Sequence, residues 1–306
     1  MPPSPILLLG ASGQLGHELR HTLAPLGPLV CPTRDELDLT ARSSVRSTIR
    51  TLRPSLIVNA AAYTAVDRAE TERDRAWLLN AEVPATLAEE AHRCGARLIH
   101  YSTDYVFDGT NDIPYTEQEA PAPLNVYGAS KWAGEQGIQA HTDNYWIFRT
   151  SWLYSDRRSN FLLTMLRLAA TRDRLTVVDD QFGSPTWVGW VAEATASMLP
   201  PSGPPGHGLP AGTYHLSSGG TTSWCDFARA IFHTFDVSGV DVVPIPTTEY
   251  PTPAARPRYS VLSPNAVQRE GHLSIPTWTE QLEAMAVRCS PLASLAQSGP
   301  PPHAAS

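Results

Sequence analysis

The sequence predicts an α/β protein in which helices cover both faces of a parallel β-sheet. Short runs of apolar and β-branched residues alternate with longer amphipathic stretches, as in repeated strand-helix-strand units. A glycine-rich turn follows the first apolar run directly, and polar residues follow the fourth. The length of 306 residues allows one or two domains with a substantial core.

Six apolar runs are expected to form one doubly wound sheet, in which ligands bind at the carboxyl ends of the strands. The predicted strands are 6–10, 28–33, 55–60, 97–102, 145–150 and 175–179. The helices expected between them are 14–24, 43–52, 70–94, 127–141 and 160–171. The alternation of these strands and helices predicts a Rossmann-like core.

Beyond about residue 180 the alternation becomes less regular, so we expect a smaller, discontinuous C-terminal domain for the substrate. Its region contains a predicted helix at 187–199, a Pro/Gly-rich surface loop at 200–212, strands at 212–218 and 240–246, and helices at 223–235 and about 277–288. The larger domain is predicted to comprise 1–152 with roughly 175–200 and 245–262. The smaller domain comprises roughly 153–174, 201–244 and 263–290, and 291–306 is a flexible tail.

Charge and composition exclude several classes of partner. A net charge of −7 disfavours binding to nucleic acid or to an anionic membrane. The four cysteines form no C-x-x-C pair, which disfavours a zinc site or a disulfide framework. No apolar stretch is long enough for a membrane span. We therefore expect a cytoplasmic protein, monomeric or homodimeric, that binds small molecules.

The first candidate site is the turn that joins the first strand to the first helix. Gly10, Gly13 and Gly16 lie in the segment Gly-Ala-Ser-Gly-Gln-Leu-Gly. Glycines there let the backbone approach a pyrophosphate, and the helix N-terminus supplies N–H donors. The alternative is a tight turn without a ligand, but the preceding strand favours a dinucleotide site.

The end of the second strand usually decides which nicotinamide cofactor binds. An acid there favours the free ribose hydroxyl, whereas an arginine accommodates a 2′-phosphate. Arg34 favours NADPH, although Asp35 beside it leaves NADH open, and an exposed loop arginine is the structural alternative. Asp38 is expected near the adenine side of the pocket.

Tyr127 and Lys131 form a possible acid and its activator. Their spacing of four residues places both on one face of the predicted helix. A lysine charge about 4 Å from a phenol is worth roughly 4 kcal/mol at an effective dielectric near 20, which is about three pKa units. We therefore expect Lys131 to bring the pKa of Tyr127 toward neutrality. Y-x-x-x-K alone occurs often by chance, so its context decides.

That context is the end of the fourth strand, where Ser102, Thr103 and Asp104 stand. A hydroxyl there can hold a substrate carbonyl oxygen. Trp152 follows the fifth predicted strand, 145–150, and offers a flat apolar face for a sugar ring. The alternative is a tryptophan of the core. Arg256 and Arg258 could clamp a diphosphate, or could be ordinary surface arginines.

Taken together, these residues resemble the extended short-chain dehydrogenase/reductases, and among them the dTDP-4-dehydrorhamnose reductases. The resemblance runs from residue 6 to about 288. Its most specific stretches are NAAAYTAVD (59–67), YSTDYVF (101–107) and PLNVYG (123–128), joined by RTSWLY (149–154), DDQFGSPT (179–186) and YPTPAARP (250–257).

The resemblance implies reduction of the C4 ketone of dTDP-6-deoxy-L-lyxo-4-hexulose to dTDP-β-L-rhamnose by NADPH, with NADH as an alternative. It implies three catalytic residues: Tyr127 as proton donor, Lys131 as its activator, and Thr103 as the hydrogen-bond donor to the oxygen. Cofactor contacts are expected from Gly10, Gly13, Gln14, Leu15, Gly16, Arg34, Asp38, Leu39, Ala62, Tyr63, Thr64, Tyr127 and Lys131. Substrate contacts are expected from Thr103, Asp104, Trp152 and Arg256.

Some members of this family bind Mg²⁺ through glutamates at a dimer contact. Glu18 occupies one such position, but Gly189 stands at another, so we expect no metal. Two other functions stay open: reduction of a different dTDP-4-keto-6-deoxy sugar, distinguished only by the loops near 152–160 and 182–190, and a noncatalytic nucleotide-binding regulatory subunit. The presence of Tyr127 and Lys131 argues against the second. An epimerase or dehydratase is disfavoured because Tyr105 follows Asp104 where a second carboxylate would be expected.

Overall fold

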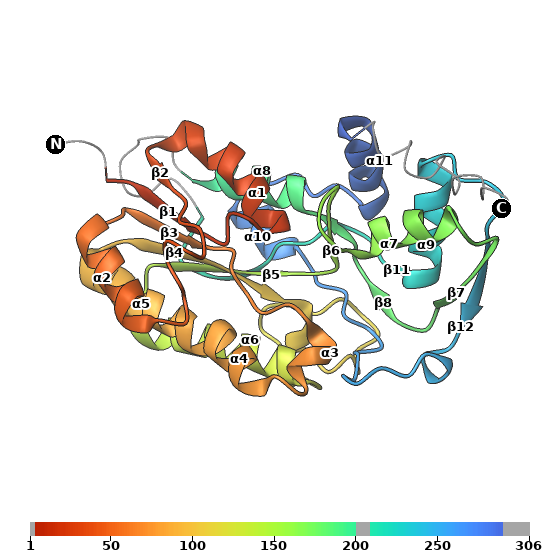
Figure 1. The fold of residues 1–306 in the computed structure, drawn as a ribbon, viewed down its shortest axis with the longest axis horizontal. Helices are drawn as coiled ribbons and strands as arrows, with labels where there is room; N and C mark the ends of the chain where they lie inside the picture. The colour runs from red at the N-terminus through yellow and green to blue at the C-terminus, as the bar shows by residue number, and fades with distance from the viewer. Residues whose placement is uncertain (1–3, 200–208, 290–306) are drawn as a thin grey trace, which may run out of the picture.

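A six-stranded parallel sheet forms the centre of the larger part of the molecule (Figure 1). The computed structural model describes residues 4–199 and 209–289. The strand order is β10-β5-β4-β3-β1-β2, and every neighbouring pair is parallel. The strands are β1 (Ile6–Leu9), β2 (Leu29–Val30), β3 (Leu56–Asn59), β4 (Arg97–Thr103), β5 (Tyr145–Thr150) and β10 (Gly212–His215). The predicted doubly wound α/β fold is confirmed.

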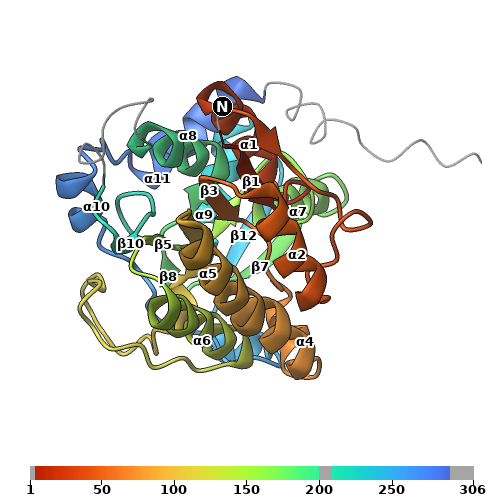
Figure 2. The same cartoon turned by 90° about the vertical axis from the view of Figure 1, so that its left-hand side faces the viewer.

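Helices cover the two faces of this sheet, as the alternation of strand side chains requires (Figure 2). Leu8 faces a core formed with α1 (Gln14–Leu23) and α8 (Val188–Met198). Its neighbour Leu7 faces a second core formed with α2 (Arg42–Leu52), α5 (Val83–Cys94) and α6 (Val126–His141). Short helices α3 (Val66–Ala69), α4 (Arg73–Trp77) and α10 (Asn265–Glu270) complete this part, with 3₁₀ turns η1 (Ala24–Leu26) and η3 (Asp104–Val106).

The smaller part packs beyond the carboxyl ends of the central strands, on the right in Figure 1. Among residues 153–199 and 209–289 it contains three two-stranded sheets and three helices. The strand pairs are β6 (Leu153–Tyr154) with β9 (Thr186–Trp187), β7 (Arg174–Val178) with β12 (Asp241–Ile245), and β8 (Phe182–Gly183) with β11 (Thr222–Ser223). The helices are α7 (Phe161–Ala169), α9 (Trp224–Thr234) and α11 (Trp278–Arg288), with the 3₁₀ turn η4 (Thr247–Glu249).

One strand was predicted correctly but assigned to the wrong sheet. The run 175–179 was expected as the sixth strand of the central sheet, but β7 pairs with β12 in the smaller part. The sixth central strand is β10, which was assigned to the smaller domain. A local apolar pattern marks a buried strand without specifying its partner. The division of the chain into two domains stays a prediction, with these two strands exchanged.

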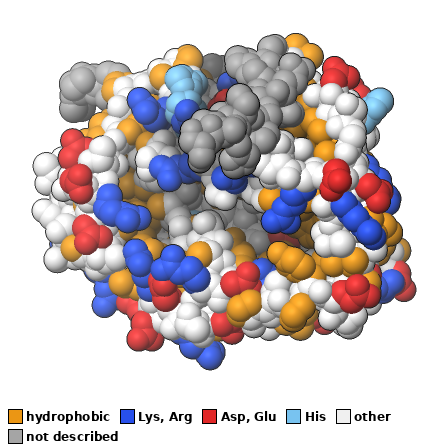
Figure 3. Space-filling model, turned by 45° about the vertical axis from the view of Figure 1, so that its right-hand side comes forward, with side chains coloured by type: hydrophobic (Ala, Val, Ile, Leu, Met, Phe, Trp, Pro, Cys, Tyr) orange, Lys and Arg blue, Asp and Glu red, His pale blue; other side chains and the backbone are white. Residues whose placement is uncertain are grey.

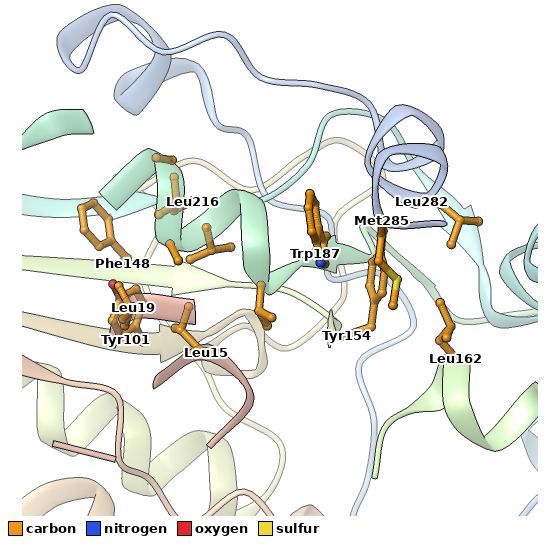
Figure 4. Close-up of a cluster of buried hydrophobic side chains, with 14 of the residues drawn as sticks. Leu15, Leu19, Tyr101, Phe148, Tyr154, Leu162, Trp187, Leu216, Leu282 and Met285 are labelled. Atoms are coloured by element: carbon orange, nitrogen blue, oxygen red, sulfur yellow. The ribbon is translucent and has the colours of Figure 1, made fainter. Parts of the chain in front are cut away.

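A continuous apolar core joins the two parts (Figure 4). Leu15, Tyr101 and Phe148 lie at the central sheet, whereas Leu162, Leu282 and Met285 come from the smaller part. Tyr154 and Trp187 lie between the two groups. No helix within the described ranges is both long and apolar enough to cross a membrane. The predicted tail at 291–306 and most of the predicted loop at 200–212 lie outside the described residues.

Candidate active site

The carboxyl ends of β1, β3 and β4 open into a cavity of about 700 Å³. The cavity lies where the chain order reverses, because β2 flanks β1 on one side and β3 flanks it on the other. Such a reversal is the place where open α/β sheets bind ligands. Twelve predicted site residues line the cavity: Gly10, Gly13, Gln14, Leu15, Arg34, Ala62, Thr64, Thr103, Asp104, Tyr127, Lys131 and Trp152.

The glycine turn has the backbone geometry that close approach requires. Gly10 has a φ of +79°, and a Cβ there would lie 2.6 Å from the Ala61 nitrogen. Gly16 is not part of the cavity wall, and a Cβ there would lie 2.1 Å from the Gly10 oxygen, so it allows helix α1 to pack against the turn. No side chain caps α1, which leaves its first N–H groups free for a ligand.

Four further predicted residues also lie away from the cavity wall. Asp38 accepts hydrogen bonds from the Thr40 nitrogen and hydroxyl at 2.9 and 2.8 Å. Leu39 packs on the core beneath α2 and α5, and Tyr63 is buried beside α3. Of these three, only Tyr63 has chain neighbours, Ala62 and Thr64, in the cavity wall.

Arg256, the fourth, is held by a carboxylate of the protein itself. Its guanidinium donates to both oxygens of Asp67, at 2.5 and 2.7 Å. The same ion pair lowers the pKa of Asp67. Arg256 also interacts with Tyr105, which lines the cavity. A diphosphate would therefore compete with Asp67 for this arginine.

Tyr127 lies in the first turn of α6 and faces the cavity. The helix begins at this position because Asn125 caps it, its Oδ1 accepting from the Gly128 nitrogen at 2.8 Å. Burial raises the pKa of Tyr127 to about 12, the Asp104 charge adds to the rise, and a hydrogen bond with Thr103 opposes it. The phenol therefore keeps its proton at neutral pH.

Lys131 does not lower the pKa of Tyr127 as predicted. Its Nζ lies 3.0 Å from His100 Nε2 and donates to the Tyr101 carbonyl oxygen at 2.5 Å. Burial lowers the pKa of Lys131 to about 7, so much of its charge is lost at neutral pH. The expected shift assumed a permanent cation beside the phenol, and burial removes that condition.

Asp104, which lines the cavity, is a buried hydrogen-bond acceptor. It accepts from Thr103 Oγ1 at 3.0 Å, from Ser151 Oγ at 3.1 Å and from Ser260 Oγ at 2.6 Å. Burial raises the pKa of Asp104 to about 6, against the effect of these three hydroxyls. Because Thr103 has a single hydroxyl proton, a carbonyl oxygen would compete with Asp104 for the hydrogen bond that Thr103 is predicted to donate. Ser151 and Ser260 were not predicted as partners of Asp104, because they lie far from it along the chain and only the fold brings them to it.

A buried ion pair supports the strand and helix that carry these groups. Arg149 on β5 donates to Glu135 on α6, with the shortest contact 2.7 Å, and both side chains are almost fully buried. Ser102 on β4 donates to the same carboxylate at 2.5 Å. The pair fixes α6 against β4 and β5, and thereby fixes Tyr127 relative to Thr103.

Four of the polar residues that line the cavity are treated together below. We call Thr103, Asp104, Tyr127 and Lys131 the polar wall.

Two tryptophans, Trp152 and Trp224, form an aromatic part of the cavity lining. Trp152 stacks on Trp224 with ring centroids 3.4 Å apart and ring planes 3° from parallel, and Phe161 packs on Trp224. Trp152 has a φ of +46°, and Gly183 makes room for it, since a Cβ there would lie 2.3 Å from the indole. We call Trp152 and Trp224 the aromatic wall. Trp224 was not predicted as a site residue, because only the fold brings α9 to Trp152.

Asn80 is a second residue that sequence reasoning missed. It lies in a π-helical turn, η2 (Leu78–Glu82), between α4 and α5. Its amide accepts from the Tyr63 nitrogen at 2.8 Å and donates to the Tyr63 oxygen and to Ser130 Oγ, both at 3.0 Å. Asn80 thus ties the segment 62–64 to α6. A π turn of this kind gives no periodic signal in the sequence.

The loop 155–160 connects the smaller part to the glycine turn. Ser155 Oγ and Asn160 Nδ2 donate to Gln14 Oε1, at 2.7 and 2.9 Å. Arg158 Nε donates to the Ser12 oxygen at 2.6 Å. At the far end of α1, Glu18 accepts from Arg288 at 2.6 Å, so the carboxylate considered for a metal is engaged by an arginine.

A glycine turn at the head of a parallel sheet, a strand-end threonine and a tyrosine-lysine pair on the following helix define a nucleotide-dependent short-chain dehydrogenase/reductase. The model of the RmlD substrate binding domain matches residues 4–290, and the chain belongs to this family.

Relatives and solved structures agree with this family. The chain is 44% identical over 289 residues to a dTDP-4-dehydrorhamnose reductase of Shigella flexneri, covering 92% of this chain and 96% of the relative. It is 39% identical over 278 residues to a dTDP-4-keto-6-deoxy-D-glucose reductase of Streptomyces niveus, covering 90% and 94%. A dTDP-4-dehydrorhamnose reductase of Bacillus anthracis in complex with NADP has a TM-score of 0.86 at 39% identity, covering 94% and 99%.

Proposed function

We propose that the protein reduces dTDP-4-dehydro-L-rhamnose to dTDP-β-L-rhamnose, the last step of dTDP-L-rhamnose biosynthesis, with NADPH as the reductant. The observation that supports this most directly is the meeting of Thr103 and Tyr127 in the cavity that the glycine turn borders. The Shigella flexneri relative is named for this activity, and this chain is similar to it over 96% of its length.

The residues present fit a dinucleotide. Side chains at Gly10 and Gly16 would collide with the protein backbone, so these glycines permit the tight turn whose helix N-terminus could bind a pyrophosphate. Gln14, Leu15, Ala62, Thr64 and Lys131 line the space beyond it. When bound, the nicotinamide supplies the hydride. Arg34 lines the cavity and favours NADPH, as does the NADP in the Bacillus anthracis structure, with NADH as the alternative.

The protein's own chemistry is the delivery of a proton to the C4 oxygen. Thr103 donates a hydrogen bond to that oxygen when its single hydroxyl proton turns from Asp104, which accepts it in the absence of substrate. Tyr127 donates the proton to the oxygen as negative charge develops, since an alkoxide is more basic than a phenolate. The pKa of about 12 keeps Tyr127 protonated before the reaction. Trp152 and Trp224 provide a flat apolar surface for the deoxysugar.

A second function is supported by the Streptomyces niveus relative, whose name specifies a different dTDP-4-keto-6-deoxy sugar. The polar wall would act identically on such a substrate. The noncatalytic alternative lacks support, because Thr103, Tyr127 and Lys131 all line one cavity.

The test is absorbance at 340 nm with the purified protein, NADPH or NADH in turn, and the 4-keto sugar nucleotide generated by its dehydratase and epimerase. We expect NADPH consumption that requires the epimerase, with rhamnose in the product. Consumption without the epimerase would instead favour the second function, and no consumption with either substrate would favour the noncatalytic one.

Location and assembly are also proposals. The four cysteines are free, which supports a reducing compartment such as the cytoplasm. We propose a monomer or homodimer without a metal, and the pairing of Glu18 with Arg288 supports the last point.

A further inference from the structure

Arg158, in the loop 155–160, lines the cavity but has no role in the mechanism described above. Lys131 is the only lysine of the chain and is buried, so the basic side chains drawn in blue on the surface in Figure 3 are arginines. Many surface arginines pair with a carboxylate, as Arg42 does with Glu82 at 3.1 Å. Among residues 4–199 and 209–289, by contrast, no carboxylate forms an ion pair with Arg158.

The side chain of Arg158 lies against the glycine turn. Its Nε donates to the Ser12 oxygen at 2.6 Å, and Ser12 directly precedes Gly13, the N-cap residue of α1. No side chain caps this helix, and its first turn holds no acidic residue. A guanidinium and a helix N-terminus are both positive, so they repel each other unless an anion binds beside them. Within the described chain, Nη1 and Nη2 of Arg158 have no hydrogen-bond partner and are available to such an anion.

The backbone of Arg158 has an unfavourable conformation. Its φ is +58°, in the left-handed region that a side chain with a Cβ rarely adopts. Ser155 Oγ and Asn160 Nδ2 hold the preceding peptide bond, because both donate to the Arg157 oxygen, at 3.0 and 3.2 Å. Trp152, at +46°, shares this conformation and also lines the cavity. Backbone strain of this kind is typical of residues held in place for a ligand.

The place of Arg158 in the cavity indicates which anion it meets. Arg34 follows β2, where the 2′-phosphate of NADPH is expected, whereas Arg158 contacts the turn expected to receive the pyrophosphate. A guanidinium presents paired N–H groups that match two phosphate oxygens. We propose that Arg158 binds the pyrophosphate of the dinucleotide cofactor together with the N-terminus of α1. This proposal deepens the proposed function, on which it rests, by adding a residue of the smaller part to the cofactor site.

The sugar nucleotide also carries two linked phosphates, so the test has to separate the two ligands. Isothermal titration calorimetry measures the Kd of three probes without turnover. NADP⁺ contains the pyrophosphate, adenosine 2′-monophosphate contains only the 2′-phosphate, and dTDP contains the diphosphate of the sugar nucleotide. In Arg158→Ala we expect the Kd of NADP⁺ to rise about tenfold, as for the loss of a charge-assisted hydrogen bond. The Kd values of the other two probes should be unchanged.

Arg157→Ala is the matched control. Arg157 is the neighbouring arginine, but it does not line the cavity, and its Nε lies 3.9 Å from a carboxylate oxygen of Asp156. The variant removes one positive charge from the same loop, so a general electrostatic effect would weaken NADP⁺ binding in both variants alike. We expect the Kd of NADP⁺ to be unchanged in Arg157→Ala.

Two further variants separate the guanidinium from the backbone that carries it. Glycine adopts a φ of +58° without the cost of a Cβ, so Arg158→Gly removes the side chain and preserves the loop. It should show the same rise in the Kd of NADP⁺ as Arg158→Ala. Arg158→Lys keeps a positive charge without the paired N–H groups, and it should recover part of the affinity.

An unchanged Kd of NADP⁺ in both Arg158→Ala and Arg158→Gly would overturn the proposal. A rise for dTDP in place of NADP⁺ would also overturn it, by assigning the arginine to the sugar nucleotide, and an equal rise for adenosine 2′-monophosphate would assign it to the 2′-phosphate. The expected shifts in a protein without reductase activity would refute the proposed function alone. An active reductase whose affinity for NADP⁺ does not depend on Arg158 would refute only the role of this arginine.

Discussion

The two walls of the cavity are built on different principles. The polar wall comes from β4, η3 and α6, and each of its side chains has a hydrogen-bond partner of the protein itself. The aromatic wall joins Trp152, which follows the central strand β5, to Trp224 at the start of α9, and is held by stacking and by the room at Gly183. Hydrogen bonds fix direction, whereas stacking fixes a plane and tolerates sliding within it. The polar wall should therefore control rate, and the aromatic wall should control affinity.

Tyr127→Phe is the strongest test of the expectation that the polar wall controls the rate. Loss of the proton donor should reduce kcat by about 10²–10⁴, with the dissociation constant of NADPH nearly unchanged. Tyr115→Phe is the control, because its hydroxyl is bonded to Asp108, outside the cavity lining. Steady-state kinetics and cofactor titration measure both effects. Full activity in Tyr127→Phe would remove the tyrosine from the chemistry.

Lys131→Met tests the polar wall through stability and cofactor binding. The pKa of Lys131 falls from 10.5 to about 7 on folding, so the unfolded chain binds more protons between these values. The unfolding free energy should then rise with pH above 7, by about 1.4 kcal/mol per unit from this group. Denaturant unfolding at pH 7 and 9 should show this slope in the unsubstituted protein and its loss in Lys131→Met.

If the two proteins have the same slope, Lys131 keeps its charge on folding. The variant should also bind cofactor more weakly and turn over more slowly. An effect on neither would place the lysine outside the site.

Trp224→Ala tests the aromatic wall. It removes the stacking partner of Trp152, a contact worth about 0.5–1.5 kcal/mol beyond its buried area. We expect KM for the sugar nucleotide to rise about tenfold, with a smaller change in kcat. Trp278→Ala is the control, because it removes an aromatic ring that packs on Phe227 and does not line the cavity, and it should leave KM unchanged. A fall confined to kcat would contradict the division between the walls.

The smallest effect is expected at the rim of the cavity. Arg34→Ala should weaken NADPH binding about fivefold, near the 1 kcal/mol of an exposed ion pair, and should spare NADH. Arg42→Ala removes another exposed arginine, paired with Glu82, as a control. Calorimetric titration with both cofactors measures the ratio. Equal losses for NADPH and NADH would mean that Arg34 does not meet the 2′-phosphate.

The difference between local spacing and contacts between distant segments explains which site residues the sequence could predict. The glycine turn, Thr103, Tyr127 and Lys131 each follow a strand or share a helix face, so local spacing places them in one cavity. Trp224, Asn80 and His100 depend on contacts between distant segments or on a π turn, which no period encodes. The pairing of β7 with β12 was missed for the same reason. The pKa of Tyr127 was mispredicted because burial is a property of the fold.

The loop 155–160 joins the aromatic side of the cavity to the glycine turn. Its hydrogen bonds to Ser12 and Gln14 connect the segment that follows Trp152 to the turn expected to receive the pyrophosphate. Two ligands that bind to one hydrogen-bonded unit are thermodynamically linked. Whatever factor the cofactor imposes on the affinity for the sugar nucleotide, the sugar nucleotide must impose the same factor on the affinity for the cofactor.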